Sequence, residues 1–124
     1  EIDVARPLEI AGERIVPVSG HHSERFEVTG YRIGRMAYLT DFKTIADAEV
    51  GKLIGVELLV VNALRFRPHP SHFNVEEALA LIARVAPRRA LITHVSHEIG
   101  RHAATTALLP RGVELAYDGL EIII

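Results

Sequence analysis

The stretch Ala90-Leu91-Ile92-Thr93-His94-Val95-Ser96-His97-Glu98 decides how this sequence is interpreted. It begins as a short apolar run behind Pro87 and ends on Thr93-His94, where polar residues suited to a helix start take over. A short apolar run bounded by proline is typical of a buried strand. A side chain at the carboxyl end of such a strand is held by rigid backbone and faces the crevice where α/β sheets bind ligands. We therefore predict that His94 is a metal ligand.

A second strand end repeats this arrangement. Met36-Ala37-Tyr38-Leu39 is another apolar run, and it ends on Thr40-Asp41, a threonine followed by a group able to bind metal. If both runs are strands of one sheet, their carboxyl ends meet at one edge. The sequence therefore predicts a shared site for Asp41 and His94.

The first part of the chain predicts a meander of short antiparallel strands, because its alternating or apolar runs are separated by turn residues. The expected strands span residues 8–10, 14–18, 26–33 and 36–40. Between the second and third strands, residues 19–23 are expected to form a polar loop that carries His21 and His22.

The rest of the chain predicts helices alternating with buried strands, which is the pattern of an α/β (α+β) fold with a mixed sheet and flanking helices. The expected helices, caps included, span 45–54, 74–86 and 96–109, and the expected strands span 56–61, 89–93, 113–117 and 120–124. Asn74 and Glu77 form a capping box for the middle helix. Asp118-Gly119 is a strong type I′ turn signal, which predicts a hairpin between the last two strands.

The composition restricts the function. A chain of 124 residues with 48% hydrophobic residues suits one small domain with a real core. A formal net charge of -2 gives no general attraction to nucleic acid or to an anionic membrane. Because there is no cysteine, any metal must be held by imidazole and carboxylate. No apolar run is long enough to span a bilayer and no signal peptide is visible, so the cytoplasm is the expected location.

Six of the seven histidines fall into three close sets, while His102 stands alone. The sets are His21/His22, His69/His72 and His94/His97. A single histidine is more often a surface residue or a hydrogen-bonded core residue than a ligand. Three sets beside predicted strand ends favour metal chemistry.

Four ordered motifs carry a family resemblance. They are Gly30–Gly34, Ala37–Asp41, Ala63–Phe73 and Leu91–His97. Together they resemble the carboxyl-terminal half of metallo-β-lactamase-fold hydrolases, and they are most similar to the phosphodiesterase branch that acts on phosphoribosyl cyclic phosphate. The resemblance implies that residues 1–124 are half of an αββα sandwich. The family's His-x-His-x-Asp-His signature, which lies in the amino-terminal half, is absent.

The resemblance also implies a role for individual residues. Asp41 matches the carboxylate that bridges two metal ions, zinc or manganese, and His94 and His22 match further ligands. His21 stays open as the alternative to His22. His72 matches a catalytic histidine that contacts the scissile phosphate and assists the leaving oxygen.

The residues around these positions carry weaker predictions. Arg65, Arg67 and His69 are expected to bind the phosphate of the substrate, and the alternative for them is a solvated basic loop. His97 is expected either to orient His94 or to be a residue of the first helical turn. Asn62 stands where several relatives carry Asp.

The implied function is that of a metal-dependent phosphodiesterase with a small phosphodiester substrate, completed by the missing amino-terminal half. The chain alone is expected to be inactive and to form a homodimer, because the face shared with the other half would expose side chains such as Val60 and Val61. Two alternatives stay open. One is a non-catalytic interaction or assembly domain, and the other is a tRNA-processing-type nuclease, for which no substrate-clamping arm is visible.

Overall fold

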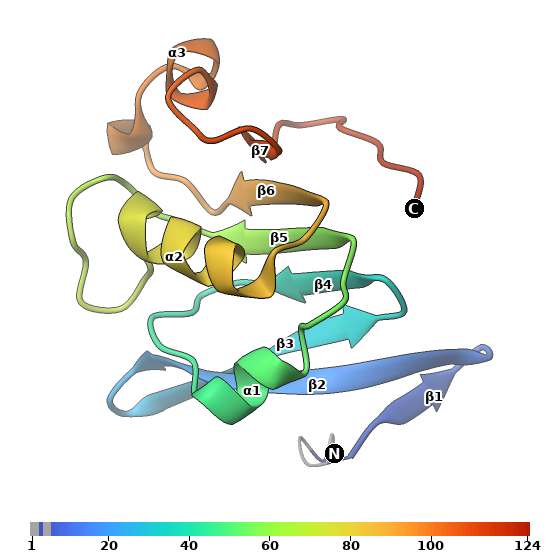
Figure 1. The fold of residues 1–124 in the computed structure, drawn as a ribbon. Coiled ribbons are helices and arrows are strands. Elements are labelled where there is room, and N and C mark those ends of the chain that lie inside the picture. The colour runs from blue at the N-terminus through green and yellow to red at the C-terminus, as the bar shows by residue number, and fades with distance from the viewer. Residues whose placement is uncertain (1–2, 4–5) are drawn as a thin grey trace.

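The computed structural model describes residue 3 and residues 6–124, and its main feature is one mixed sheet of seven strands (Figure 1). Residues 1, 2, 4 and 5 of the predicted domain lie outside the described residues. The strands are β1 (Leu8–Ile10), β2 (Glu13–Ser23), β3 (Phe26–Ile33), β4 (Met36–Leu39), β5 (Leu58–Asn62), β6 (Arg89–Thr93) and β7 (Val113–Leu115). The helices are α1 (Asp47–Gly51), α2 (Val75–Val85), α3 (His102–Thr106) and a short 3₁₀ helix (His97–Ile99).

The strands lie in the sheet in chain order. From β1 to β4 they are antiparallel, which confirms the predicted meander, and from β4 to β7 they are parallel. Strands β4, β5 and β6 therefore end at the same edge of the sheet, and β2 also ends there (Figure 1). Four chain segments thus deliver their last residues to one edge.

Helices α1 and α2 cover one face of the sheet (Figure 1). The core between them and the sheet includes the fully buried Leu39, Leu59 and Ile92. The predicted capping box of α2 is confirmed: Asn74 Oδ1 accepts a hydrogen bond from the Glu77 amide, and Glu77 Oε2 accepts one from the Asn74 amide. None of the helices in the described residues is long and apolar enough to cross a membrane.

The opposite face of the sheet is partly covered by the carboxyl-terminal segment 116–124. Leu120 and Ile122 pack there on Leu58, Val60 and Leu91. The predicted exposure of Val60 and Val61 is wrong: Val60, on this face, is 7% exposed, and Val61, in the core on the helix-covered face, is 0% exposed. The predicted terminal hairpin is also wrong: Leu120 and Ile122 pack on the sheet, residues 120–124 form no strand, and β7 pairs in parallel with β6.

Three further predictions of element bounds need correction. The predicted helix 96–109 is split into the 3₁₀ helix and α3, because Gly100 between them has a φ of 94°. The predicted polar loop 19–23 is part of β2, whose ladder to β3 continues to the end of that strand. Helix α1 is shorter than the predicted 45–54, although Gly55 ends this segment with a φ of 86°, as expected.

Candidate metal centre

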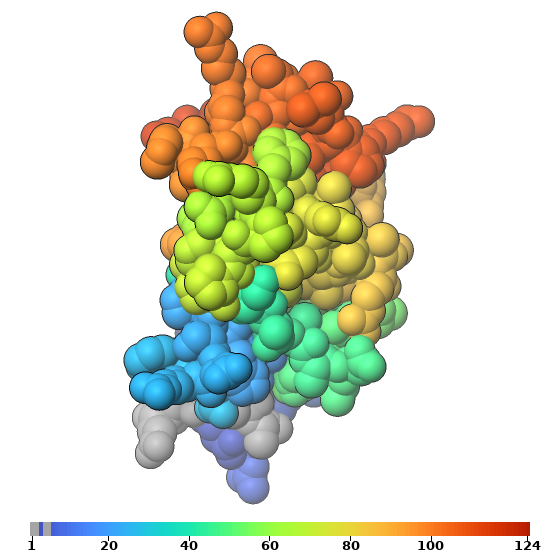
Figure 2. All heavy atoms as spheres, turned by 90° about the vertical axis from the view of Figure 1, so that its left-hand side faces the viewer, coloured from blue at the N-terminus to red at the C-terminus, as the bar shows by residue number. Residues whose placement is uncertain are grey.

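The site lies at the edge of the sheet where β2, β4 and β6 end. His22 is near the end of β2, Asp41 follows β4 and His94 follows β6. His72 joins them from the loop between β5 and α2. Figure 2 looks onto this edge, where that loop, residues 63–74, stands between the β2–β3 hairpin and the residues that follow β6. The structure therefore brings the four residues singled out by the sequence to one place.

Three atoms of this group that could bind a metal form a nearly regular triangle. Asp41 Oδ1 lies 3.2 Å from His72 Nε2 and 3.3 Å from His94 Nε2, and the two Nε2 atoms are 3.1 Å apart. Ligands bound at about 2.0–2.1 Å around a tetrahedral ion stand roughly 3.3–3.4 Å from one another. The triangle has nearly these dimensions, and imidazole with carboxylate is a donor set suited to zinc or manganese. The residues present fit a divalent metal.

The structure brings His22, and not His21, to this group. Neighbouring strand residues point to opposite faces, and His21 is exposed while His22 faces Asp41. His22 Nδ1 lies 3.0 Å from the Asp41 carbonyl oxygen. Because a carbonyl only accepts, Nδ1 carries the proton, which leaves the Nε2 lone pair of His22 for a metal. One ligand atom each from His22, Asp41 and His72 lies within 4.8 Å of the others.

Asp41 and His94 share an uncommon backbone conformation. Their φ angles are 64° and 57°, in the left-handed region that residues other than glycine rarely adopt. The other described residues of this kind are Ala11, in a turn, and Ala86, at the end of α2. Such strain persists only where the surrounding structure enforces it, and it gathers at functional sites. Two residues in this conformation, one just after β4 and one just after β6, therefore support the assignment of a site here.

The neighbourhood sets the protonation of Asp41 and His72. Burial acts to raise the pKa of Asp41, but the hydrogen bond from Thr40 and the charges of the nearby imidazoles hold the pKa of this carboxyl below its ordinary value. Burial lowers the pKa of His72, against the hydrogen bond to Asp41, which raises it. Three imidazoles add to that lowering: His22, His94 and His69. Near pH 7 Asp41 is therefore ionised, which is the state that binds metal, and His72 is neutral.

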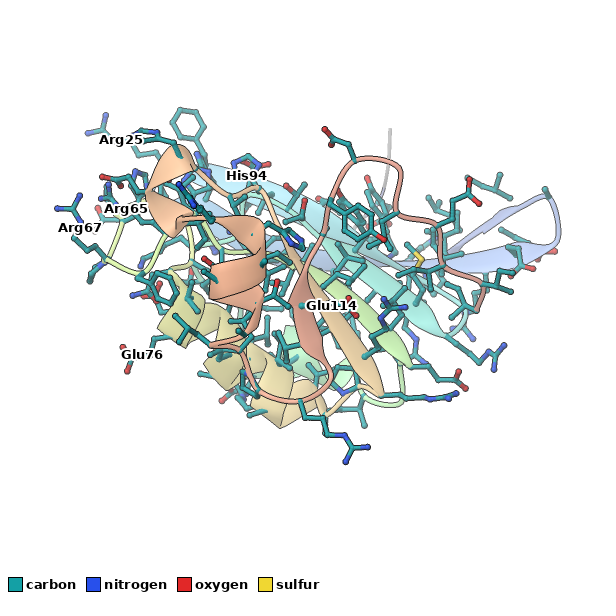
Figure 3. The ribbon with its side chains drawn as sticks, turned by 90° about the horizontal axis from the view of Figure 1, so that it is seen from above. Arg25, Arg65, Arg67, Glu76, His94 and Glu114 are labelled. Atoms are coloured by element: carbon teal, nitrogen blue, oxygen red, sulfur yellow. The ribbon has the colours of Figure 1, made fainter. Side chains whose placement is uncertain are left out.

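The two predicted phosphate-binding arginines are both paired with Glu98. Arg65 Nη1 donates to Glu98 Oε2 at 2.6 Å and Arg67 Nη2 donates to Glu98 Oε1 at 2.5 Å. These bonds, first that of Arg65 and then that of Arg67, lower the pKa of Glu98. Arg67 remains 75% exposed, so most of its donors face solvent. In Figure 3 both arginines lie towards the same end of the molecule as His94, far from Glu114.

The two remaining predicted residues have different surroundings. His69 lies against His72, with their Nδ1 atoms 3.3 Å apart and the Ser71 hydroxyl within 3.4 Å of both. His97 belongs to the 3₁₀ helix and is exposed. Among the described residues, no hydrogen bond or ring contact joins His97 to His94. The structure thus brings His69 to the site and leaves His97 outside it.

A matching family profile, described as a beta-lactamase superfamily domain, covers residues 1–95. The chain therefore belongs to the beta-lactamase superfamily, a fold family of metal-dependent hydrolases. A crystal structure described as a new diphosphatase from the PhnP family is 36% identical, with a TM-score of 0.94, and the match covers 99% of this chain and 47% of that chain. An octanoyltransferase of Porphyromonas gingivalis (strain ATCC BAA-308 / W83) is 37% identical over an alignment of 125 residues, which covers 100% of this chain and 25% of that protein.

More distant structures show the fold alone. The metallo-β-lactamase fold protein YhfI from Bacillus subtilis matches with a TM-score of 0.73 at 17% identity, over 96% of this chain and 53% of that chain. The short form of human tRNase Z matches with a TM-score of 0.70 at 16% identity, over 91% of this chain and 44% of that chain. The mixed sheet with its helices therefore matches half of a metallo-β-lactamase fold, which confirms the predicted fold class.

Proposed function

We propose that the complete protein is a metal-dependent phosphodiesterase and that residues 1–124 are the carboxyl-terminal half of its metallo-β-lactamase-like domain. The convergence of His22, Asp41, His72 and His94 at one edge of the sheet is the observation that carries this proposal. The 36% identity to a diphosphatase supports hydrolysis at phosphorus, and the chain spans about half of that protein. The other half would supply the His-x-His-x-Asp-His ligands.

Asp41, His22 and His94 are the proposed ligands from this half of the domain. Asp41 would offer Oδ1, which faces His72 and His94, while Oδ2 accepts a hydrogen bond from the Thr40 hydroxyl at 3.1 Å. The Nδ1 bond of His22 to the backbone fixes the ring with Nε2 available. When bound, two divalent cations, zinc or manganese, supply the Lewis acidity that activates water near neutral pH.

His72 is proposed to assist the departure of the leaving oxygen. Its burial and its imidazole neighbours favour the neutral ring in the free protein. An anionic phosphodiester beside His72 opposes that effect, because a nearby negative charge favours the imidazolium. Substrate binding would then favour the protonated ring of His72, which could donate a proton to the leaving oxygen. His69 and Ser71 lie within hydrogen-bonding distance of His72 Nδ1.

The proposed substrate is a small phosphodiester. Arg67 and His69 are the proposed donors to phosphate oxygens. Arg67 is 75% exposed despite its ion pair with Glu98, whereas Arg65 is more buried and also donates to the Pro68 carbonyl at 3.0 Å. Large nucleic acids are a poorer proposal, because the net charge of -2 supplies no general attraction for a polyanion. The absence of cysteine is consistent with a cytoplasmic enzyme.

Self-association of the 124-residue chain is a further part of the proposal. Tyr38 and Tyr117 remain 42% and 55% exposed on the sheet face that Leu120 and Ile122 cover only in part. A second copy, or the other half of the domain, would cover this face.

The decisive comparison is between the 124-residue chain and the complete protein. The isolated chain should bind Zn²⁺ or Mn²⁺ weakly and hydrolyse bis-p-nitrophenyl phosphate negligibly, because it holds only part of the ligand set. Calorimetric titration and a chromogenic assay test both statements. Tight binding of two metals with turnover by the isolated chain would refute the need for the other half. Lack of a His-x-His-x-Asp-His motif upstream of Glu1 would favour a non-catalytic interaction domain.

A further inference from the structure

Asn62 is the most unusual buried polar residue of the chain. It ends β5, whose five residues are all buried, and its own side chain is 0% exposed. Asparagine is mostly found at protein surfaces, and a buried amide is tolerated when its donors and acceptor are satisfied. The partners of Asn62 therefore indicate why the residue is there.

Both polar atoms of the Asn62 side chain bond to one residue. Oδ1 accepts a hydrogen bond from the Phe42 amide and Nδ2 donates one to the Phe42 carbonyl, each at 2.9 Å. The β4–β5 ladder ends at the pair Leu39 and Val61, one residue earlier. The Asn62 amide thus replaces a peptide group and continues the pairing beyond the ladder. It fixes the backbone directly after Asp41.

Asp41 needs such a restraint because of its backbone. Its φ of 64° is costly for a residue with a side chain, and the chain must leave β4 in this conformation to turn the carboxylate to the edge. The Phe42 ring, 0% exposed, provides the second anchor: a Cβ atom at Gly20 would lie 2.2 Å from it, so the ring sits directly on β2. Asn62 and Gly20 together hold Phe42 from two sides.

The same end of β5 also touches the neighbours of the other site residues. The Phe42 carbonyl accepts a second bond from the Phe73 amide at 2.8 Å, and Phe73 follows His72. The Ala63 amide donates to the Thr93 carbonyl at 3.1 Å, and Thr93 precedes His94. Asn62 therefore stands where the backbones carrying Asp41, His72 and His94 are joined.

We propose that Asn62 is a positioning residue of the metal centre, which acts by holding Phe42 and through it the Asp41 carboxylate and the His72 loop. The role of Asn62 rests on the proposed metal centre. It concerns the distances among the ligand atoms, and it assigns Asn62 no contact with metal or substrate. Loss of the amide should therefore weaken metal binding even where the fold is kept.

The test is a Zn²⁺ titration of the complete protein, followed through the imidazole NMR signals of His22, His72 and His94. Asn62→Leu keeps the approximate volume and removes both hydrogen bonds, and we expect its Zn²⁺ affinity to fall at least about tenfold, the range found for lost partners of metal ligands. Thr105→Val is the matched control, since Thr105 is 3% exposed and its hydroxyl donates to the Ile99 carbonyl, away from Asp41. Its affinity should stay within about twofold of the wild type.

The outcomes separate the two proposals. Zn²⁺ binding by a folded Asn62→Leu chain with wild-type affinity overturns the role of Asn62 and leaves the metal centre standing. A wild-type complete protein in which Zn²⁺ moves none of the three imidazole signals overturns the metal centre itself. If Asn62→Leu does not fold, hydrogen exchange of the wild type decides: the Phe42 amide should be protected as strongly as the β5 amides. Exchange of that amide as fast as in exposed loops overturns the proposal.

Discussion

Replacement of His94 by glycine should make the protein more stable than replacement by alanine, although both changes remove a proposed ligand. His94 has a φ of 57°, and the left-handed conformation costs a residue with a Cβ atom about 1–2 kcal/mol. Glycine avoids this cost but loses about 0.5–1 kcal/mol through its greater freedom in the unfolded chain. The difference favours His94→Gly over His94→Ala by about 0.5–1 kcal/mol.

Comparing the two variants isolates the free-energy cost of the left-handed backbone conformation at position 94. Both remove the same imidazole, which stacks on His72 with ring centroids 4.8 Å apart, so the lost contacts cancel. For a chain of this size, about 0.5–1 kcal/mol corresponds to a difference in Tm of roughly 2–4 °C. Thermal unfolding followed by circular dichroism measures it. Neither variant should bind Zn²⁺ as the wild type does.

Thr93 provides a matched control, since it lies in the regular strand β6 immediately before His94. There the sign should reverse, with Thr93→Gly less stable than Thr93→Ala, because glycine weakens a strand. A His94→Gly chain that is less stable than His94→Ala would refute the idea that the backbone at position 94 is strained in the folded protein.

Three further predictions concern catalysis, charge and assembly. In the complete protein, His72→Ala should lower kcat by about 10²-fold or more with metal content unchanged, and metal loss equal to that of His94→Ala would instead make His72 a ligand. Glu98 should stabilise the fold through Arg65 and Arg67 at pH values above the ordinary Glu pKa of 4.5, and this stabilisation should disappear as the pH falls through the lower pKa of Glu98 in the folded state. The difference in stability between the wild type and Glu98→Gln should therefore vanish in acid. A difference that is constant with pH would contradict the ion pairs. The 124-residue chain should sediment as a dimer at tens of micromolar, and Tyr38→Glu should shift it to monomer; a wild-type monomer with low dye binding would show that segment 116–124 covers the face sufficiently.

The sequence predicts those parts of the fold that are determined by residues close together in the chain. The apolar runs that end on Thr40-Asp41 and Thr93-His94 predict buried strands and place their last residues at one edge, because parallel strands share a direction. Asn74 and Glu77 predict the start of α2, since a capping box needs only residues three apart. Such signals depend on near neighbours in the chain, so the fold around the site follows from them.

The errors arise where distant segments decide. Asp118-Gly119 carries a strong turn signal, but Leu120 and Ile122 gain more by covering Leu58 and Leu91 than by pairing with β7. The ion pairs of Glu98 with residues about thirty positions away have no local pattern either. Asn62 follows the predicted strand 56–61, and no local pattern indicates its partner Phe42, which lies twenty positions earlier.

The central claim, a metal-dependent phosphodiesterase built on Asp41, His94 and the other half of the domain, is tested most directly with the complete protein stripped of metal by a chelator. Hydrolysis of bis-p-nitrophenyl phosphate and of a small ribose cyclic phosphodiester is then measured while Zn²⁺ or Mn²⁺ is added back and the bound metal is counted. We predict no hydrolysis without metal and a rise with metal that saturates at two ions per chain, with Asp41→Asn remaining inactive. Hydrolysis by the stripped protein at the full rate, or none with two ions bound, would contradict the claim.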